Sequence, residues 1–190
     1  MKVVGFNGSP RKNGNTSIAI QTVFSELEKE GIETELVQIG GREIKGCDGC
    51  NKCRKDGSGF CVIESDIVNE CLEKMYRANG IIIGSPVYFG SVTPETKAFI
   101  DRVGYCARGG GFLLKGKVCA AVVVLRRGGA VQAFNQINSL FYLNQAIIPC
   151  SIYWNMAIGR EIGEIRNDEE GMKTFKVLGQ NMAWLLKKIC

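Results

Sequence analysis

The chain has 190 residues, of which 45% are hydrophobic and 23% are charged, and its formal net charge is +5. This composition is typical of a soluble globular protein, and it excludes both a disordered chain and a membrane-spanning segment. The basic residues are scattered along the sequence, so we expect no nucleic-acid binding. The length suits one domain with a sizeable core, and we predict a single domain over residues 1–190.

The sequence contains nine cysteines and no histidine. The apolar run at the start, in MKVVGFNGSPRK, is too short for an export signal, so we expect a cytoplasmic protein with reduced thiols. The lack of histidine removes the usual general base and every imidazole metal ligand. We therefore assign no catalytic side chain, and we expect any metal to be bound by sulfur or oxygen.

Apolar, β-rich runs alternate with stretches of helical period along the chain. The predicted strands are residues 2–6, 33–39, 80–85, 118–125 and 147–153, and the helices with clear limits are residues 17–29, 94–103, 130–142 and 168–189. Such alternation predicts βαβ units and a parallel sheet. We expect five strands and five helices in a doubly wound α/β fold, with ligands beyond the carboxyl ends of the strands.

The stretch directly after the first strand, GSPRKNGNTS at residues 8–17, predicts a phosphate site. Small residues let the backbone approach an anion, Arg11 can pair with it, and the following helix begins with free N–H groups. Neither GxGxxG nor GxxxxGK[ST] is present, so a monophosphate is favoured over NAD or ATP. The alternative is an ordinary strand-to-helix turn with a Ser or Thr cap.

A second apolar loop follows the buried strand at residues 80–85. It contains Pro86, Val87, Tyr88 and Phe89, and apolar groups with free backbone N–H groups suit a flat heteroaromatic ring. The alternative is a hydrophobic turn whose aromatic side chains belong to the core.

The longest connection, residues 40–63, holds six glycines and four cysteines without helical period, and we treat it as an insertion with a function. Cys47, Cys50, Cys53 and Cys61 run as C-x2-C-x2-C-x7-C, which is the ligand pattern of a cubane iron-sulfur cluster. A four-thiolate zinc site, a redox-active dithiol and thiols without a role stay open as alternatives. The isolated Cys71, Cys106, Cys119, Cys150 and Cys190 receive no role.

The two loops, together with RRGG at residues 126–129, resemble the NADPH-dependent FMN reductase and iron-sulfur flavoprotein group over essentially the whole chain. The resemblance implies a flavodoxin-like five-stranded sheet of order 2-1-3-4-5 with helices on both faces, and FMN as cofactor. Carried over, the FMN-binding residues are Ser9, Arg11, Asn15, Thr16 and Ser17 at the phosphate, Ser85, Pro86, Val87, Tyr88, Phe89 and Gly90 beside the ring, and Arg127, Gly128 and Gly129 after the fourth strand.

The cysteine motif resembles the iron-sulfur branch of this group, which implies a 4Fe-4S cluster on Cys47, Cys50, Cys53 and Cys61. We expect electron transfer between a ferredoxin-like carrier and acceptors through the cluster and FMN. The alternatives are an NAD(P)H-dependent FMN or quinone reductase without a cluster, and a regulatory module that binds flavin or zinc. Because the cysteine loop follows an edge strand in this fold, we expect a homo-oligomer, a dimer or tetramer, in which the cluster serves a neighbouring flavin.

The polar segment at residues 159–168, GREIGEIRND, has no assigned structure. It can cover the flavin, bind a partner or have neither role.

Overall fold

A computed structural model describes residues 1–190 and contains one five-stranded sheet. The strands are β1 (Lys2–Asn7), β2 (Glu33–Gln38), β3 (Gly80–Pro86), β4 (Val118–Leu125) and β5 (Met156–Ile158). Their order is β2-β1-β3-β4-β5 and every neighbouring pair is parallel. The predicted flavodoxin-like arrangement is confirmed.

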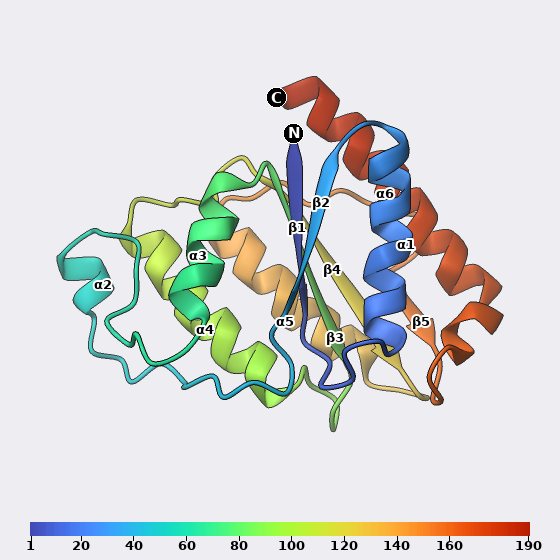
Figure 1. The fold of residues 1–190 in the computed structure, drawn as a ribbon, viewed down its shortest axis with the longest axis horizontal. Coiled ribbons are helices and arrows are strands. Elements are labelled where there is room, and N and C mark those ends of the chain that lie inside the picture. Colours follow the sequence, from blue (N-terminus) through green and yellow to red (C-terminus); the bar gives the residue numbers. More distant parts are fainter.

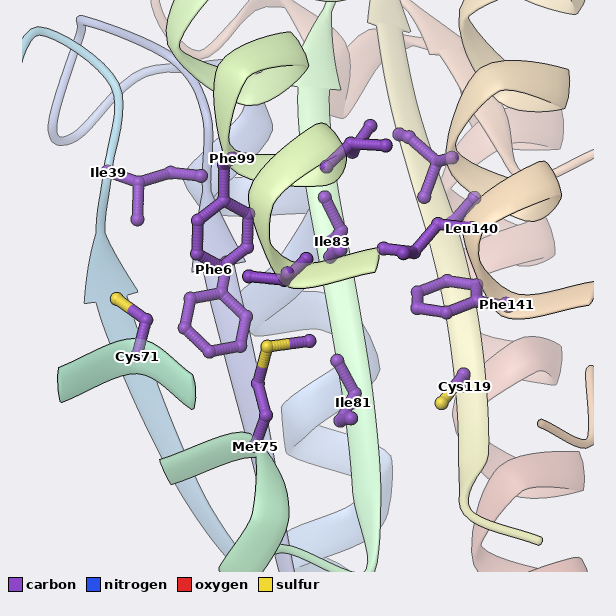
Figure 2. Close-up of a cluster of buried hydrophobic side chains, with 14 of the residues drawn as sticks. Phe6, Ile39, Cys71, Met75, Ile81, Ile83, Phe99, Cys119, Leu140 and Phe141 are labelled. Carbon is purple, nitrogen blue, oxygen red and sulfur yellow. The ribbon is translucent and has the colours of Figure 1, made fainter. Parts of the chain in front are cut away.

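Helices cover both faces of the sheet (Figure 1). One face carries α1 (Asn15–Lys29) and α6 (Glu169–Ile189), which pack against each other, and the other carries α3 (Val68–Arg77), α4 (Pro94–Gly109) and α5 (Ala130–Leu143). Because neighbouring side chains of a strand point to opposite faces, Val3 packs under α1 and α6 whereas Val4 and Phe6 belong to the opposite core. Figure 2 shows that opposite core, where the Phe6 and Phe99 ring centroids lie 5.0 Å apart.

The fifth strand lies later in the chain than the predicted residues 147–153. Ile147 makes only an isolated bridge to Val118. Pro149 has no N–H to donate to the ladder, so the chain leaves the sheet there, and Trp154 is exposed. It returns where the Asn155 carbonyl accepts a hydrogen bond from the Val123 N–H at 2.9 Å. The prediction of a strand from the apolar run at residues 147–153 was therefore wrong, and the strand is β5.

The connection at residues 40–63 contains one short helix, α2 (Lys52–Lys55), which the sequence pattern did not predict. It begins after Asn51, whose φ of 57° is left-handed. Figure 1 shows this connection leaving β2 and passing beside α3 and α4, away from α1 and α6. A short 3-10 helix at Glu164–Asn167 precedes α6. None of the helices has both the length and the apolar character needed to cross a membrane.

Candidate functional site

A hollow of about 220 Å³, called here the strand-end hollow, lies at the carboxyl ends of β1, β3, β4 and β5. Its lining comes from four loops: Ser9, Arg11, Asn15, Thr16, Pro86, Val87, Tyr88, Val124, Leu125, Arg126, Gly159 and Arg160. The fold thus brings together seven residues that the sequence marked as cofactor-binding, from residues 9–16 and 86–88. Their role in binding stays a prediction.

The loop after β1 is held in one shape by buried hydrogen bonds. The Asn7 Oδ1 accepts from the Ser9 N–H at 3.1 Å, and the Thr93 hydroxyl donates to the Gly8 carbonyl at 2.8 Å. A Cβ on Gly8 would lie 1.9 Å from the Thr96 hydroxyl oxygen, so only glycine fits there. The loop is therefore preorganised at the entrance to α1.

Helix α1 begins beside the strand-end hollow without a side-chain cap. Its N-cap residue is Gly14, no side chain accepts from the first-turn N–H groups, and the first turn has no acidic residue. Arg11, Arg126 and Arg160 line the hollow and no Asp or Glu does. Free N–H groups, the positive end of the helix dipole and arginines together favour an anionic ligand group.

The segment after β5 forms one wall of this hollow. Asn15 binds it with both polar atoms: Nδ2 donates to the Glu161 carbonyl at 2.8 Å and Oδ1 accepts from the Gly163 N–H at 2.7 Å. Glu164 accepts from the backbone N–H groups of Glu161 and Arg160, which lowers the pKa of its carboxyl. Asn15 is therefore a positioning residue for this wall, and its second Nδ2–H is the one side-chain donor not used by these two hydrogen bonds.

Several predicted cofactor-binding residues lie outside the strand-end hollow. Ser17 lines a separate surface hollow with Asn13 and Ile162. Ser85 is buried and bonded within its own loop, donating to the Pro86 carbonyl at 2.9 Å and accepting from the Thr93 N–H at 3.1 Å.

The tip of the loop after β3 also differs from expectation. Phe89 and Gly90 have φ angles of 48° and 75° and form a two-residue turn closed by mutual hydrogen bonds between Tyr88 and Ser91. Both φ angles are positive, as in a type I′ turn, and the turn leaves the Phe89 side chain fully exposed. Neither residue lines the hollow.

The loop after β4 places Arg126, rather than Arg127, Gly128 or Gly129, on the strand-end hollow. Gly129 instead begins α5 with a φ of 84°, and a Cβ there would lie 2.9 Å from Gly90 Cα. Val124, Leu125, Gly159 and Arg160 also line the hollow, although none was a predicted cofactor-binding residue. The first two end the buried strand, and the last two belong to the segment at residues 159–168, for which covering the flavin was one of three open roles.

The four motif cysteines line one small hollow between the long connection and α4, called here the cysteine hollow. Its other lining residues include Arg102, Tyr105 and Cys106 of α4. Cys47 and Cys50 are exposed, while Cys53 and Cys61 are half-buried. No three His, Cys, Asp or Glu side chains are arranged so that they could hold a metal ion. The cysteine hollow shares no lining residue with the strand-end hollow.

Burial raises the pKa of the thiols on the α4 side of the cysteine hollow. Desolvation raises the pKa of the half-buried Cys53 thiol, with a smaller opposing effect of a hydrogen bond from Cys106. Cys106 is almost fully buried, and desolvation raises its pKa much further. Cys106 therefore stays a protonated thiol and donates towards Cys53.

A larger hollow of about 370 Å³ lies between α4 and α5, next to the cysteine hollow. Tyr105 lines both, and the Arg54 guanidinium lies 5.4 Å from the centroid of its ring. Lys97 and Arg108 also line the larger hollow, and Asp101 is its one acidic residue. This surface is basic beside the motif cysteines.

Comparisons with known proteins agree with this geometry. The family described as NADPH-dependent FMN reductase matches residues 1–160. An iron-sulfur flavoprotein of Methanocaldococcus jannaschii is 38% identical over 196 residues, covering 100% of this chain and 99% of the relative. One from Archaeoglobus fulgidus is 41% identical over 157 residues, covering 82% and 75%. A solved WrbA-like flavodoxin from Agrobacterium tumefaciens has a TM-score of 0.68 at 16% identity, covering 100% and 98%, which supports the fold alone.

Proposed function

This chain belongs to the NADPH-dependent FMN reductase family and is a flavin-dependent oxidoreductase, and on that premise we propose that it passes electrons between a one-electron carrier and acceptors through FMN and a 4Fe-4S cluster. The observation that carries the proposal is the convergence of four cysteines, at the spacing of a cubane motif, on one hollow. The relatives named iron-sulfur flavoprotein support it.

The strand-end hollow fits FMN by the chemistry of its lining. The loop of Ser9 and Thr16 and the uncapped start of α1 suit the phosphate, while Pro86, Val87 and Leu125 supply apolar surface for the ring. The hollow holds no Asp, Glu or Cys, and apart from its arginines Tyr88 is its one titratable side chain. Bound FMN would supply the exchange of one or two electrons.

The cysteine hollow fits a cluster better than a single zinc ion. Structural zinc sites more often arrange four cysteines as two separated CxxC pairs, whereas this chain has the single run C-x2-C-x2-C-x7-C. A cubane distributes its four thiolates over four separate irons, so its sulfurs need to face one space without meeting at one point. The motif cysteines line such a space.

The basic surface beside the cysteines favours an acidic one-electron donor of ferredoxin type. Lys52, Arg54 and Lys55 are exposed on α2, next to Cys53, and Arg108 lines the adjoining α4–α5 hollow. Complementary charge steers association of electron-transfer partners. The second candidate function is an NAD(P)H-dependent FMN or quinone reductase, which the description of the matched family favours.

The position of the two hollows supports a homo-oligomer, a dimer or tetramer. The cysteine hollow is built against the C-terminal half of α4, and the strand-end hollow lies across the ends of β1, β3, β4 and β5. The exposed Phe89 and Tyr88 at the rim of the strand-end hollow are apolar surface that a second copy would cover. In this arrangement the cysteine centre of one subunit faces the flavin of another.

The test is the visible absorption spectrum of anaerobically purified protein, with iron, zinc and sulfide assays on the same sample. Flavin bands over a broad iron-sulfur shoulder, with about four irons per chain, support the proposal. Flavin bands with zinc or without metal contradict the cluster. Bleaching of the flavin by reduced ferredoxin but not by NADPH distinguishes the electron carrier from the reductase.

A further inference from the structure

Arg102 of α4 is fully buried and donates a hydrogen bond to a motif sulfur. Its side chain has 0% exposure, and its Nε–H donates to the Cys61 Sγ at 3.3 Å. A buried charge is costly unless it is paired and hydrogen-bonded. The buried carboxylate of Asp66 pairs with the Arg102 guanidinium, so the positive charge beside the cysteines is compensated.

The same guanidinium holds the chain on both sides of the cysteine motif. Nη1 donates to the Lys45 carbonyl at 3.2 Å, two residues before Cys47, and Nη2 donates to the Ile63 carbonyl at 2.8 Å, two residues after Cys61. Asp66 also accepts from the Lys45 N–H at 3.1 Å. One side chain therefore fixes the two ends of the segment that carries all four motif cysteines.

We propose that Arg102 is the positioning residue of the cysteine centre, and that its N–H bond to the Cys61 sulfur raises the reduction potential of the cluster. The inference rests on the proposed 4Fe-4S cluster. Reduction adds negative charge to a cluster, and hydrogen bonds to its sulfurs and nearby cations stabilise that charge. A purely structural ion pair would hold the loop but would not require contact with a sulfur.

The test compares three variants with the wild type under anaerobic conditions. Arg102→Lys keeps the positive charge but loses the planar guanidinium and its several donors. The double variant Arg102→Gln/Asp66→Asn removes both charges of the buried ion pair, so no lone buried charge is left. Arg77→Gln is the control, because it removes an exposed arginine of α3 that lines neither the cysteine hollow nor the strand-end hollow. Redox titration followed by electron paramagnetic resonance gives the cluster potential, and the FMN potential is an internal reference.

We expect a lower cluster potential in the double variant, a smaller shift in Arg102→Lys, and unchanged values in Arg77→Gln and for FMN. A cluster potential equal to the wild type in both Arg102 variants overturns the inference. Hydrogen exchange of the metal-free protein supplies a second readout: amides of residues 42–66 should exchange faster in Arg102→Lys, and unchanged exchange contradicts the positioning role. If the wild-type protein contains no iron and no sulfide, the proposed cluster itself is refuted. The iron and sulfide assays therefore distinguish failure of the proposed function from failure of this inference.

Discussion

At the scale of single residues, the site depends on side chains that hold loops as much as on those that face a ligand. Asn15 seemed from the sequence to be a phosphate donor, but both of its polar atoms bind the backbone of residues 161–163. Arg102 acts in the same way on the cysteine loop. Such roles depend on contacts between residues 39 to 148 positions apart, which a motif cannot reveal.

Asn15→Ala is expected to weaken FMN binding about tenfold, because it removes two hydrogen bonds worth about 1 kcal/mol each, not all of which affects the ligand. Fluorescence titration of the metal-free, flavin-free protein measures the change. Asn13→Ala is the control, since Asn13 is exposed in the same loop. Equal affinities of the Asn15 variant and the wild type would show that the wall formed by residues 159–163 is not needed for binding.

Cys106 is the fifth cysteine that lines the cysteine hollow. Comparing it with a motif cysteine distinguishes a thiol that binds the proposed cluster from one that only lines the hollow. Cys106 lies on α4, outside the C-x2-C-x2-C-x7-C motif, and burial raises the pKa of its thiol. We expect Cys61→Ala to lose most of its iron, whereas Cys106→Ala keeps about four irons per chain and loses only about 1 kcal/mol of stability through the small cavity. Iron assays and thermal unfolding measure both. If Cys61→Ala keeps the cluster and Cys106→Ala loses it, then Cys106 is the ligand and Cys61 only lines the hollow.

At the scale of elements, pattern and chemistry predicted most of the fold. The first four strands and the helices around them follow directly from buried apolar runs and helical period, and the loops at the strand ends lie where a parallel sheet requires. The predicted position of the fifth strand was wrong because Pro149 interrupts an apolar run. Phe89 and Arg127 do not line the strand-end hollow, because turn geometry sets the direction of a side chain, and their roles in binding stay predictions. Arg102 and Cys106 reach the cysteine hollow only through packing of α4 on the loop.

The start of the cysteine loop is packed against the loop after β1, so the two sites are connected through backbone contacts. A Cβ on Gly40 would lie 2.3 Å from the Ser9 carbonyl carbon, and Gln38 donates to the Ser9 and Gly40 carbonyls at 2.7 Å each. Gly40→Ala should therefore cost about 1–3 kcal/mol of stability and weaken FMN binding, because the loop must move.

Gly46→Ala is the matched control in the same connection, since nothing lies within 4 Å of its added Cβ. Chemical denaturation and flavin titration of both variants measure the effects. Equal stability of the two variants would mean that the loop after β1 moves to accept the added Cβ without loss of folding free energy.

At the scale of the whole molecule, the two hollows are separated by the body of α4 and its neighbours. Within one chain the cysteine hollow lies against Arg102, Tyr105 and Cys106, whereas the strand-end hollow opens at the loops after β3, β4 and β5. Symmetric association places the same surface of each copy against the other. The proposed transfer between subunits therefore requires an interface that includes both the exposed Phe89 of one copy and the cysteine hollow of the other.

Co-expression of two inactive chains under different affinity tags tests this arrangement. Cys50→Ser removes one motif cysteine, and Val87→Trp fills the strand-end hollow, so each homo-oligomer should fail to pass electrons from reduced ferredoxin to FMN. If transfer crosses the subunit boundary, the mixed oligomer retains one intact pair of sites and should show about half of the wild-type rate of flavin reduction. If transfer runs within one chain, the mixed oligomer has no intact pair and stays inactive. A monodisperse monomer with the full wild-type rate in sedimentation and stopped-flow measurements would likewise refute transfer between subunits.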